Sequence, residues 1–206
     1  MTETTRSVSL NVPLLARVEG EGALDLSLVD GEIAQLRLRI FEPPRFFEAM
    51  LRGRPYADAP DVTARICGIC PVAHQMSAFH ALEGLAGVRV EGTLRDLRRI
   101  MYLGEWLESH ALHVCMLHAP DFLGYADAVQ MAKDHPEAVR RGLFLKKVGR
   151  DLVALVGGRD IHPVNVKLGG FFDLPRPDEV APVLEVLYRA REEVRDLLKW
   201  VSGFRF

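Results

Sequence analysis

The hydrophobic pattern of this chain changes its period once, at Pro43-Pro44, and that change limits the folds open to it. Asp30-Gly31 lies between two alternating segments and is typical of the two-residue turn of a β-hairpin. Pro13 restricts the first alternating segment to an edge strand or a bend. Apolar and polar residues alternate, as in half-buried strands, over three segments: 7–18, 23–29 and 33–41. We therefore predict a small antiparallel sheet before the proline pair.

After the proline pair, apolar residues recur with the spacing of amphipathic helices. Thr93 resembles an N-cap, and Ala119-Pro120 should end the helix that follows it. Gly157-Gly158 should end the next helical segment, and a loop over 159–172 should follow. The predicted helices cover about 45–52, 71–85, 93–118, 126–156 with an interruption at His135-Pro136, and 177–200.

Composition supports a folded α+β chain and excludes several classes of protein. With 206 residues, 49% of them hydrophobic, the chain can bury a core without the help of disulfides. Its 26 Lys and Arg against 28 Asp and Glu give a net charge of −2, which argues against a dedicated nucleic-acid-binding protein. No apolar run reaches the roughly 20 residues of a membrane span, and the N-terminus lacks the pattern of a signal peptide.

These features lead to one prediction of architecture and location. We expect residues 1–206 to form a single α+β region, with strands over about 7–41 and helices from about 44. Three cysteines are too few for a disulfide framework, so a reducing, cytoplasmic location is expected.

The most informative local feature is a pair of cysteines, Cys67 and Cys70, separated by two residues. Gly68 gives the turn between them conformational freedom, so both sulfurs can point toward one site. Cys70 precedes a predicted helix N-terminus, and Arg65 lies nearby, so positive charge favours the thiolate form. His74 follows Cys70 by four residues and should lie one helical turn further on.

The residues alone leave several interpretations of the pair open. Two buried, inert cysteines are one, because free cysteine is commonly buried. A thioredoxin-like dithiol is a second, although that motif normally follows a strand. A zinc site using Cys67, Cys70, His74 and one other histidine is a third. A soft transition metal that takes its remaining ligands from distant segments is the fourth, and the pattern favours a metal site.

The segment Arg65–His74 resembles the N-terminal cysteine motif of nickel–iron hydrogenase large subunits, whose pattern is Arg-x-Cys-Gly-x-Cys followed by three residues and His. The likeness is greatest to cytoplasmic, cofactor-coupled members of that family. Four further segments resemble family elements in the family's order: RVEGEG at 17–22, FFEAMLRGRP at 46–55, LESHALHVCMLHAPDFLG at 107–124, and GRDIHP with GG downstream at 158–170.

The resemblance implies a nickel–iron centre held by four cysteine thiolates. Cys67 would be a terminal ligand of nickel, and Cys70 would bridge nickel and iron. The iron would also carry carbon monoxide and cyanide. Glu48 aligns with a glutamate that helps to bind magnesium or a similar ion. Cys115, in contrast, lies between apolar residues within a predicted helix and is interpreted as a core residue.

The resemblance also implies roles for residues that do not bind the metals. Glu19 matches a glutamate that passes protons to and from a nickel-bound cysteine, a task that suits a carboxyl group of raised pKa. His74 would orient the region of the bridging sulfur from beside the ligands. Arg65 would stabilise the charge of the thiolates.

The chain departs from the family in one important respect. The second cysteine pair of the family, in an Asp-Pro-Cys-x-x-Cys-x-x-His motif, is not in this sequence, which has no cysteine after Cys115. We therefore expect the chain to correspond to the N-terminal portion of a large subunit, to supply two of the four thiolates, and to be inactive alone.

The intact enzyme would oxidise dihydrogen or reduce protons reversibly. Its partners would be an iron–sulfur small subunit, the missing C-terminal half of the large subunit and, in some relatives, NAD(P)- or flavin-binding subunits. No cluster is expected in this chain, because its cysteines are too few. A non-catalytic interaction subunit of a hydrogenase or a complex I-like assembly is the alternative, together with the small zinc-binding protein described above.

Overall fold

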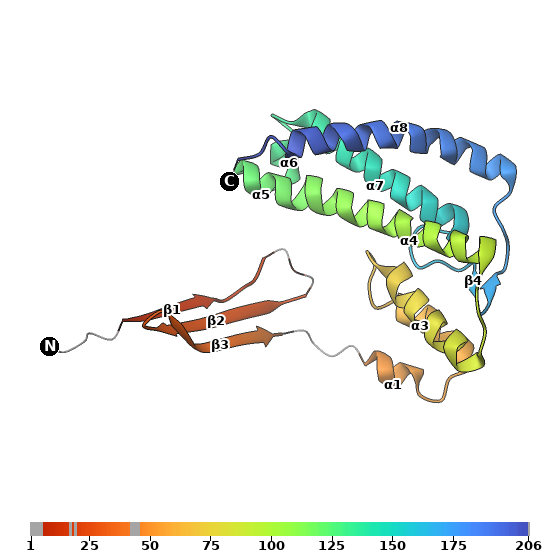
Figure 1. The fold of residues 1–206 in the computed structure, drawn as a ribbon, viewed down its shortest axis with the longest axis horizontal. Coiled ribbons are helices and arrows are strands. Elements are labelled where there is room, and N and C mark those ends of the chain that lie inside the picture. The colour runs from red at the N-terminus through yellow and green to blue at the C-terminus, as the bar shows by residue number, and fades with distance from the viewer. Residues whose placement is uncertain (1–5, 17, 19, 42–45, 206) are drawn as a thin grey trace. The chain divides into compact units, whose positions relative to one another are not determined.

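A computed structural model describes residues 6–16, 18, 20–41 and 46–205 of the chain. The chain divides into two compact units, residues 1–46 and residues 47–206, which are considered separately (Figure 1). Glu19 and Pro43-Pro44 lie outside the described residues. Within the described residues, no helix has both the length and the apolar character that crossing a membrane would require.

The first unit is an antiparallel sheet with the strand order β1-β2-β3. Its strands are β1 (Ser7–Val12), β2 (Gly22–Val29) and β3 (Glu32–Ile40). Asp30 and Gly31 have φ angles of 53° and 85°, so both central residues of the turn are left-handed, as in the hairpin predicted for Asp-Gly. β1 ends at the residue before Pro13, which has no backbone N–H to donate to a sheet.

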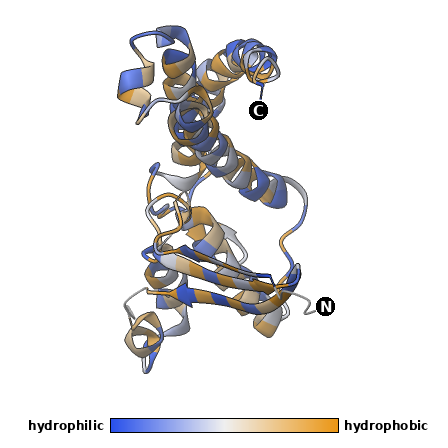
Figure 2. Cartoon of the chain, turned by 90° about the vertical axis from the view of Figure 1, so that its left-hand side faces the viewer, coloured by the Kyte–Doolittle hydropathy of each residue, from blue (hydrophilic) through white to orange (hydrophobic). Residues whose placement is uncertain are grey.

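The sheet buries little of its own apolar surface. Apolar and polar residues alternate along its strands (Figure 2), as the sequence predicts. Ala23 is fully buried, but most side chains of β1 and β3 are exposed. The exposed apolar side chains of these two strands are Val8, Leu10, Ile33, Leu36, Leu38 and Ile40. A three-stranded sheet of this kind has only a small core of its own.

The second unit is helical, and its long helices α4, α7 and α8 run alongside one another (Figure 1). The change to helical periodicity predicted after the proline pair is therefore confirmed. Its helices are α1 (Phe47–Leu51), η1 (Tyr56–Asp58), α2 (Ala59–Ala64), α3 (Pro71–Ala86), α4 (Gly92–Leu112), η2 (His113–His118), α5 (Ala119–Leu123), α6 (Ala128–Met131), α7 (Pro136–Gly157) and α8 (Pro177–Val201).

Three local predictions are wrong. Thr93 does not cap α4, which begins one residue earlier after an extended Glu91 that makes no side-chain cap bond. Ala119-Pro120 does not end the helical segment, because η2 is a π-helical turn and Pro120 lies in the first turn of α5, where its missing N–H removes no helical bond. The loop over 159–172 contains a short hairpin, β4 (Val166–Lys167) with β5 (Gly170–Phe171).

Glycines allow the close approach of α4 and α7. A Cβ atom added to Gly149 would lie 2.4 Å from the carbonyl oxygen of Gly104, so the two backbones meet directly. A Cβ atom added to Gly142 would lie 3.0 Å from the sulfur of Cys115 and 2.4 Å from its Cβ atom. Because neither contact leaves room for a side chain, these glycines fix how α7 packs on α4 and η2.

Candidate metal centre

The cysteine turn, residues 67–70, joins α2 to α3. The sulfur of Cys67 accepts hydrogen bonds from the backbone N–H of Ile69 at 3.4 Å and of Cys70 at 3.2 Å. Both cysteines are half-buried. Gly68 is not in the left-handed region, so the prediction that its freedom is needed to close the turn is not supported. The turn presents its sulfurs at the start of α3, with backbone donors already directed at one of them.

A glutamate on α4, Glu105, accepts hydrogen bonds from the first turn of α3. One carboxylate oxygen of Glu105 accepts a hydrogen bond from the N–H of Val72 at 2.7 Å, and the other from the N–H of Ala73 at 3.1 Å. Glu105 is 4% exposed. Burial raises the pKa of Glu105 to about 7, against the lowering effect of the two N–H donors, and the charge of Glu108 raises it further.

The sequence analysis did not identify Glu105 as a site residue. A signal was present in the helical spacing, because Glu105 follows the fully buried Met101 by four residues and therefore lies on the same face of α4. A carboxylate on a buried helix face needs a partner, and the sequence did not show that the partner is the N-terminus of another helix.

The loop after α7 also reaches the cysteine region. Gln75 of α3 donates from its side chain to the carbonyl oxygen of Pro163 at 2.7 Å. His162 is left-handed, with φ of 52°, and its pKa is lowered by burial and by the charge of Arg65. Within the described part of the chain, two buried side-chain atoms near this contact have no hydrogen-bond partner, Oε1 of Gln75 and Nδ1 of His162. The structure thus brings the 158–170 segment next to the cysteine motif.

The other predicted residues of the motif lie on the same stretch of backbone. Arg65 is exposed and precedes the turn, and His74 is half-buried, with its N–H 3.5 Å from the carbonyl oxygen of Cys70. The proposed orientation of the sulfurs by His74 and the stabilisation of their charge by Arg65 stay predictions.

Of the two acidic residues predicted to be functional, Glu48 alone lies within the described residues. The side chain of Glu48 is 87% exposed and forms an ion pair with Arg52 at 3.1 Å on α1. Glu19, the predicted proton carrier, falls outside the described residues.

The donor set fits part of a metal site. In the described residues, no three His, Cys, Asp or Glu side chains are grouped so that they could hold a metal ion. The zinc site of Cys67, Cys70, His74 and a further histidine is therefore not assembled. Two half-buried sulfurs on one turn are soft donors that suit a transition metal, and they fit a centre completed by ligands from elsewhere.

Cys115 is confirmed as a core residue. It is fully buried in η2, and burial raises the pKa of its thiol to about 11. Cys67 and Cys70 are therefore half-buried, whereas Cys115 is closed off from solvent.

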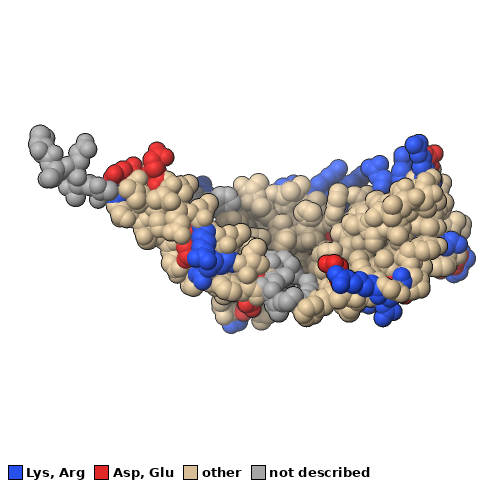
Figure 3. All heavy atoms as spheres, turned by 90° about the horizontal axis from the view of Figure 1, so that it is seen from below, with Lys and Arg blue, Asp and Glu red and all other residues tan. Residues whose placement is uncertain are grey.

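Charged side chains of both signs lie on the surface of the described residues. On the face shown in Figure 3, much of the surface is neutral, and Lys and Arg side chains occur together with Asp and Glu rather than in one continuous field. This agrees with the net charge of −2.

Comparison with known proteins places the segment that contains the cysteine turn in a known family. The sequence profile of the family described as nickel-dependent hydrogenase matches residues 45–146. Sulfhydrogenase 2 subunit alpha of Pyrococcus furiosus is 43% identical over 169 residues, which are 82% of this chain and 41% of that protein. Sulfhydrogenase 1 subunit alpha of the same organism is 34% identical, over 92% of this chain and 42% of that protein.

Solved structures show the same relationship. A NAD+-reducing [NiFe]-hydrogenase in the H2-reduced state superposes with a TM-score of 0.81 and 34% identity, over 97% of this chain and 46% of that one. The Ni-Fe-Se hydrogenase of D. vulgaris Hildenborough superposes with a TM-score of 0.73 and 25% identity, over 93% of this chain and 42% of that one. The chain thus spans less than half the length of these relatives.

Proposed function

Because the chain belongs to the nickel-dependent hydrogenase family, we propose that it supplies Cys67 and Cys70 as two thiolate ligands of a nickel–iron centre. The observation that carries this proposal is the cysteine turn itself. Its two sulfurs are half-buried on one turn within the segment that matches the family, and the third cysteine is sealed in the core. A ligand sulfur has to be reachable by the metal, and only the pair meets that requirement.

Cys67 and Cys70 would supply two of the four thiolates that hold the centre in this family. The remaining ligands would come from sequence outside this chain, because the chain matches only 41% and 42% of the length of these relatives. When bound, the nickel–iron centre supplies the reversible heterolytic cleavage of dihydrogen. The chain alone is therefore expected to be inactive.

The remaining predicted residues act around the sulfurs. Glu19 would accept and return protons at its carboxylate, a role that rests on the family resemblance. Arg65 and His74 flank the turn and would orient the thiolates and balance their charge. Glu48 would help to bind magnesium or a similar ion through its exposed carboxylate, of which one oxygen is paired with Arg52.

Electrons would leave through other subunits. The chain contains three cysteines, fewer than the four that an iron–sulfur cluster commonly needs, so an iron–sulfur small subunit is the expected acceptor. The structural neighbour described as NAD+-reducing supports NAD(P)- or flavin-binding subunits as further partners. A cytoplasmic location is proposed on the same resemblance, although one relative is a periplasmic hydrogenase.

Metal analysis and hydrogen uptake of the assembled enzyme that contains this chain would test the proposal. Nickel and iron should be present, and Cys67→Ser and Cys70→Ser should each lose nickel and hydrogen uptake. Cys115→Ser is the matched control, because it removes a sulfur that is buried away from the turn and should keep both.

A non-catalytic interaction subunit predicts a different result. Partner binding would then survive both substitutions in the turn, and the unmodified assembly would contain no nickel and take up no hydrogen. That outcome would overturn the proposed function.

A further inference from the structure

We propose that Glu105 is a positioning residue for the cysteine turn, because its buried carboxylate fixes the first turn of α3, at whose N-terminus Cys70 stands. This inference rests on the proposed function, in which Cys70 is a metal ligand. The hydrogen bonds of Glu105 are to the backbone of α3, so its effect on the site passes through that backbone.

The first turn of α3 depends on a partner outside its own helix. The first four N–H groups of any helix have no acceptor within the helix, and a side chain at the N-cap usually supplies one. In α3 the N-cap is Cys70, which makes no side-chain cap bond. The N–H groups of Val72 and Ala73 instead donate to the two oxygens of Glu105, a residue 33 positions after Val72 on another helix.

Glu105 is held where these bonds need it. The preceding residue, Gly104, is the point at which α4 meets Gly149 of α7 backbone to backbone. The close packing of α4 and α7 thus fixes the backbone that carries the carboxylate. A rigid path runs from α7 through α4 and Glu105 to the N-terminus of α3, and so to Cys70.

The surroundings of Glu105 argue for a positional role rather than a stabilising one. A buried carboxylate without a cation is costly to retain. The charged and titratable neighbours that act on it are Glu108, of like charge, and Tyr102. Glu108 itself is paired with Lys146 of α7 at 2.5 Å. The Glu105 carboxylate therefore bonds to the two N–H groups of α3. These two bonds hold the N-terminus of α3 against α4.

Amide hydrogen exchange of the full chain, resolved by residue, tests the first step. The N–H groups of Val72 and Ala73 should exchange slowly, although such groups are normally unprotected at a helix start. Glu105→Gln keeps one acceptor oxygen and should speed their exchange about 10-fold, the effect of losing roughly one hydrogen bond. Glu105→Asp, whose carboxylate is too short to reach, should not restore protection.

Asp96→Asn is the matched control for the exchange experiment. It removes an exposed carboxylate of α4 whose ion pair is with Arg95, so exchange of Val72 and Ala73 should stay slow. Slow exchange elsewhere in α3 shows that the variants remain folded. Equal exchange of the two amides in the unchanged chain and in both Glu105 variants would overturn the proposal.

Cysteine labelling tests the step from helix to site. Reaction with iodoacetamide at fixed pH, quantified by peptide mass spectrometry, should become several-fold faster at Cys70 in Glu105→Gln than in the unchanged chain. Cys115 should stay unlabelled in both as a check of folding. Faster amide exchange with unchanged labelling of Cys70 would reduce Glu105 to a helix cap and overturn its positioning role.

Neither readout requires nickel, a partner subunit or hydrogen. The cysteine variants could therefore keep their nickel, against the proposed function, while the Glu105 variants still show the expected exchange and labelling. The opposite combination of results would contradict only the positioning role of Glu105.

Discussion

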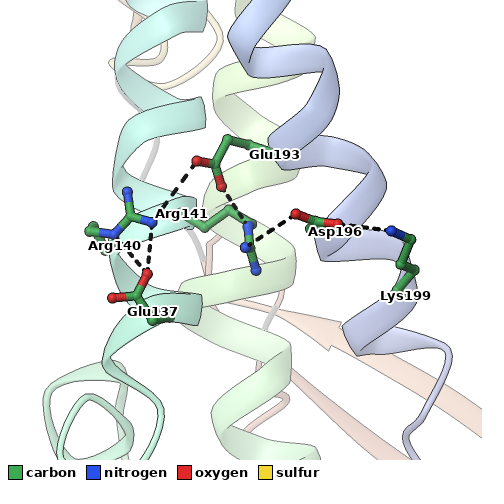
Figure 4. Close-up of polar contacts among 6 residues, drawn as sticks. All are labelled: Glu137, Arg140, Arg141, Glu193, Asp196 and Lys199. Atoms are coloured by element: carbon green, nitrogen blue, oxygen red, sulfur yellow. Dashed lines mark hydrogen bonds and ion pairs between the residues drawn. The ribbon is translucent and has the colours of Figure 1, made fainter.

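Charged side chains join α3 to α4 and α7 to α8, and they do so in opposite ways. Between α3 and α4, Arg98 donates to both oxygens of Glu83 at 2.7 Å, and the two side chains are 4% and 6% exposed. Between α7 and α8, Arg141 donates to Glu193 at 2.8 Å with both side chains 16% exposed, and Figure 4 shows that further ion pairs extend from this contact into solvent-exposed positions.

The difference lies in how much water each group has lost. A buried charge without its partner is strongly unfavourable, whereas an exposed charge is solvated whether or not it is paired. Burial alone would raise the pKa of Glu83, but hydrogen bonds from Arg98 and from the N–H of Gly169 outweigh it and lower the pKa. The α3–α4 contact, near the C-terminal end of α3, should therefore be intolerant of change, and the α7–α8 contact should be tolerant.

The largest effect is expected from Arg98→Met, which leaves Glu83 buried without its cation. The free energy of unfolding should fall by about 3–5 kcal/mol. Urea denaturation followed by circular dichroism measures this fall. The double variant Arg98→Met/Glu83→Leu should recover much of it, because no unpaired charge then remains. A loss below about 1 kcal/mol in the single variant would place this pair with the exposed ones.

The next effect is the pH dependence contributed by Glu105. Its pKa is about 7 in the folded chain and near 4.5 when unfolded, so the folded state holds the extra proton. This contribution to the free energy of unfolding is complete below pH 4.5 and is lost as the pH rises to about 7, by about 3 kcal/mol.

Glu105→Gln supplies the control, because the Gln side chain does not titrate. Subtracting its unfolding curve removes the opposite contribution of His162, whose lowered pKa makes the folded state less stable as the pH falls. A difference between the two proteins that does not change between pH 4.5 and 7 would show that Glu105 is ionised normally in the fold.

Gly149→Ala should have an intermediate effect by forcing α7 away from α4. The added Cβ atom would lie 2.4 Å from the carbonyl oxygen of Gly104, and backbone cannot move aside as a side chain can. Overpacking of this kind costs about 1–3 kcal/mol. Thermal unfolding of this variant beside Gly84→Ala, where the same atom meets no neighbour within 4 Å, isolates the clash.

The smallest effect is expected from Arg141→Ala at the α7–α8 contact. Asp196 is half exposed, and Glu193 keeps a second cation, Arg140 at 3.9 Å, so the free energy of unfolding should fall by no more than about 1 kcal/mol. Denaturation in low and high salt measures the contribution, since salt screens such pairs. A fall as large as that of Arg98→Met would remove the distinction between the two contacts.

The parts of the fold that follow from local chemistry were predictable from sequence. Asp30-Gly31 supplies the two left-handed residues of a hairpin turn, and Gly158, with φ of 81°, ends α7 as expected. α8 spans Pro177–Val201 against a prediction of 177–200, because its apolar periodicity and its proline at the first turn are unambiguous.

The features that depend on distant partners were not predictable. The π-helical turn at His113–His118 has no local signal, and Ala119-Pro120 suggested an end that does not occur. At the candidate site, the motif identified Cys67 and Cys70, but the cap of α3 comes from Glu105, far along the chain. Periodicity shows that such a residue is buried, and only the packing of α3 on α4 shows what it touches.

The account depends most on the proposal that Cys67 and Cys70 are nickel ligands, and nickel X-ray absorption of the assembly that contains this chain tests it directly. We predict a nickel coordination shell of sulfur that loses intensity in Cys67→Ser and in Cys70→Ser, or no bound nickel in these variants, and that is unchanged in Cys115→Ser. Bound nickel with the same sulfur shell in all four proteins would contradict the assignment.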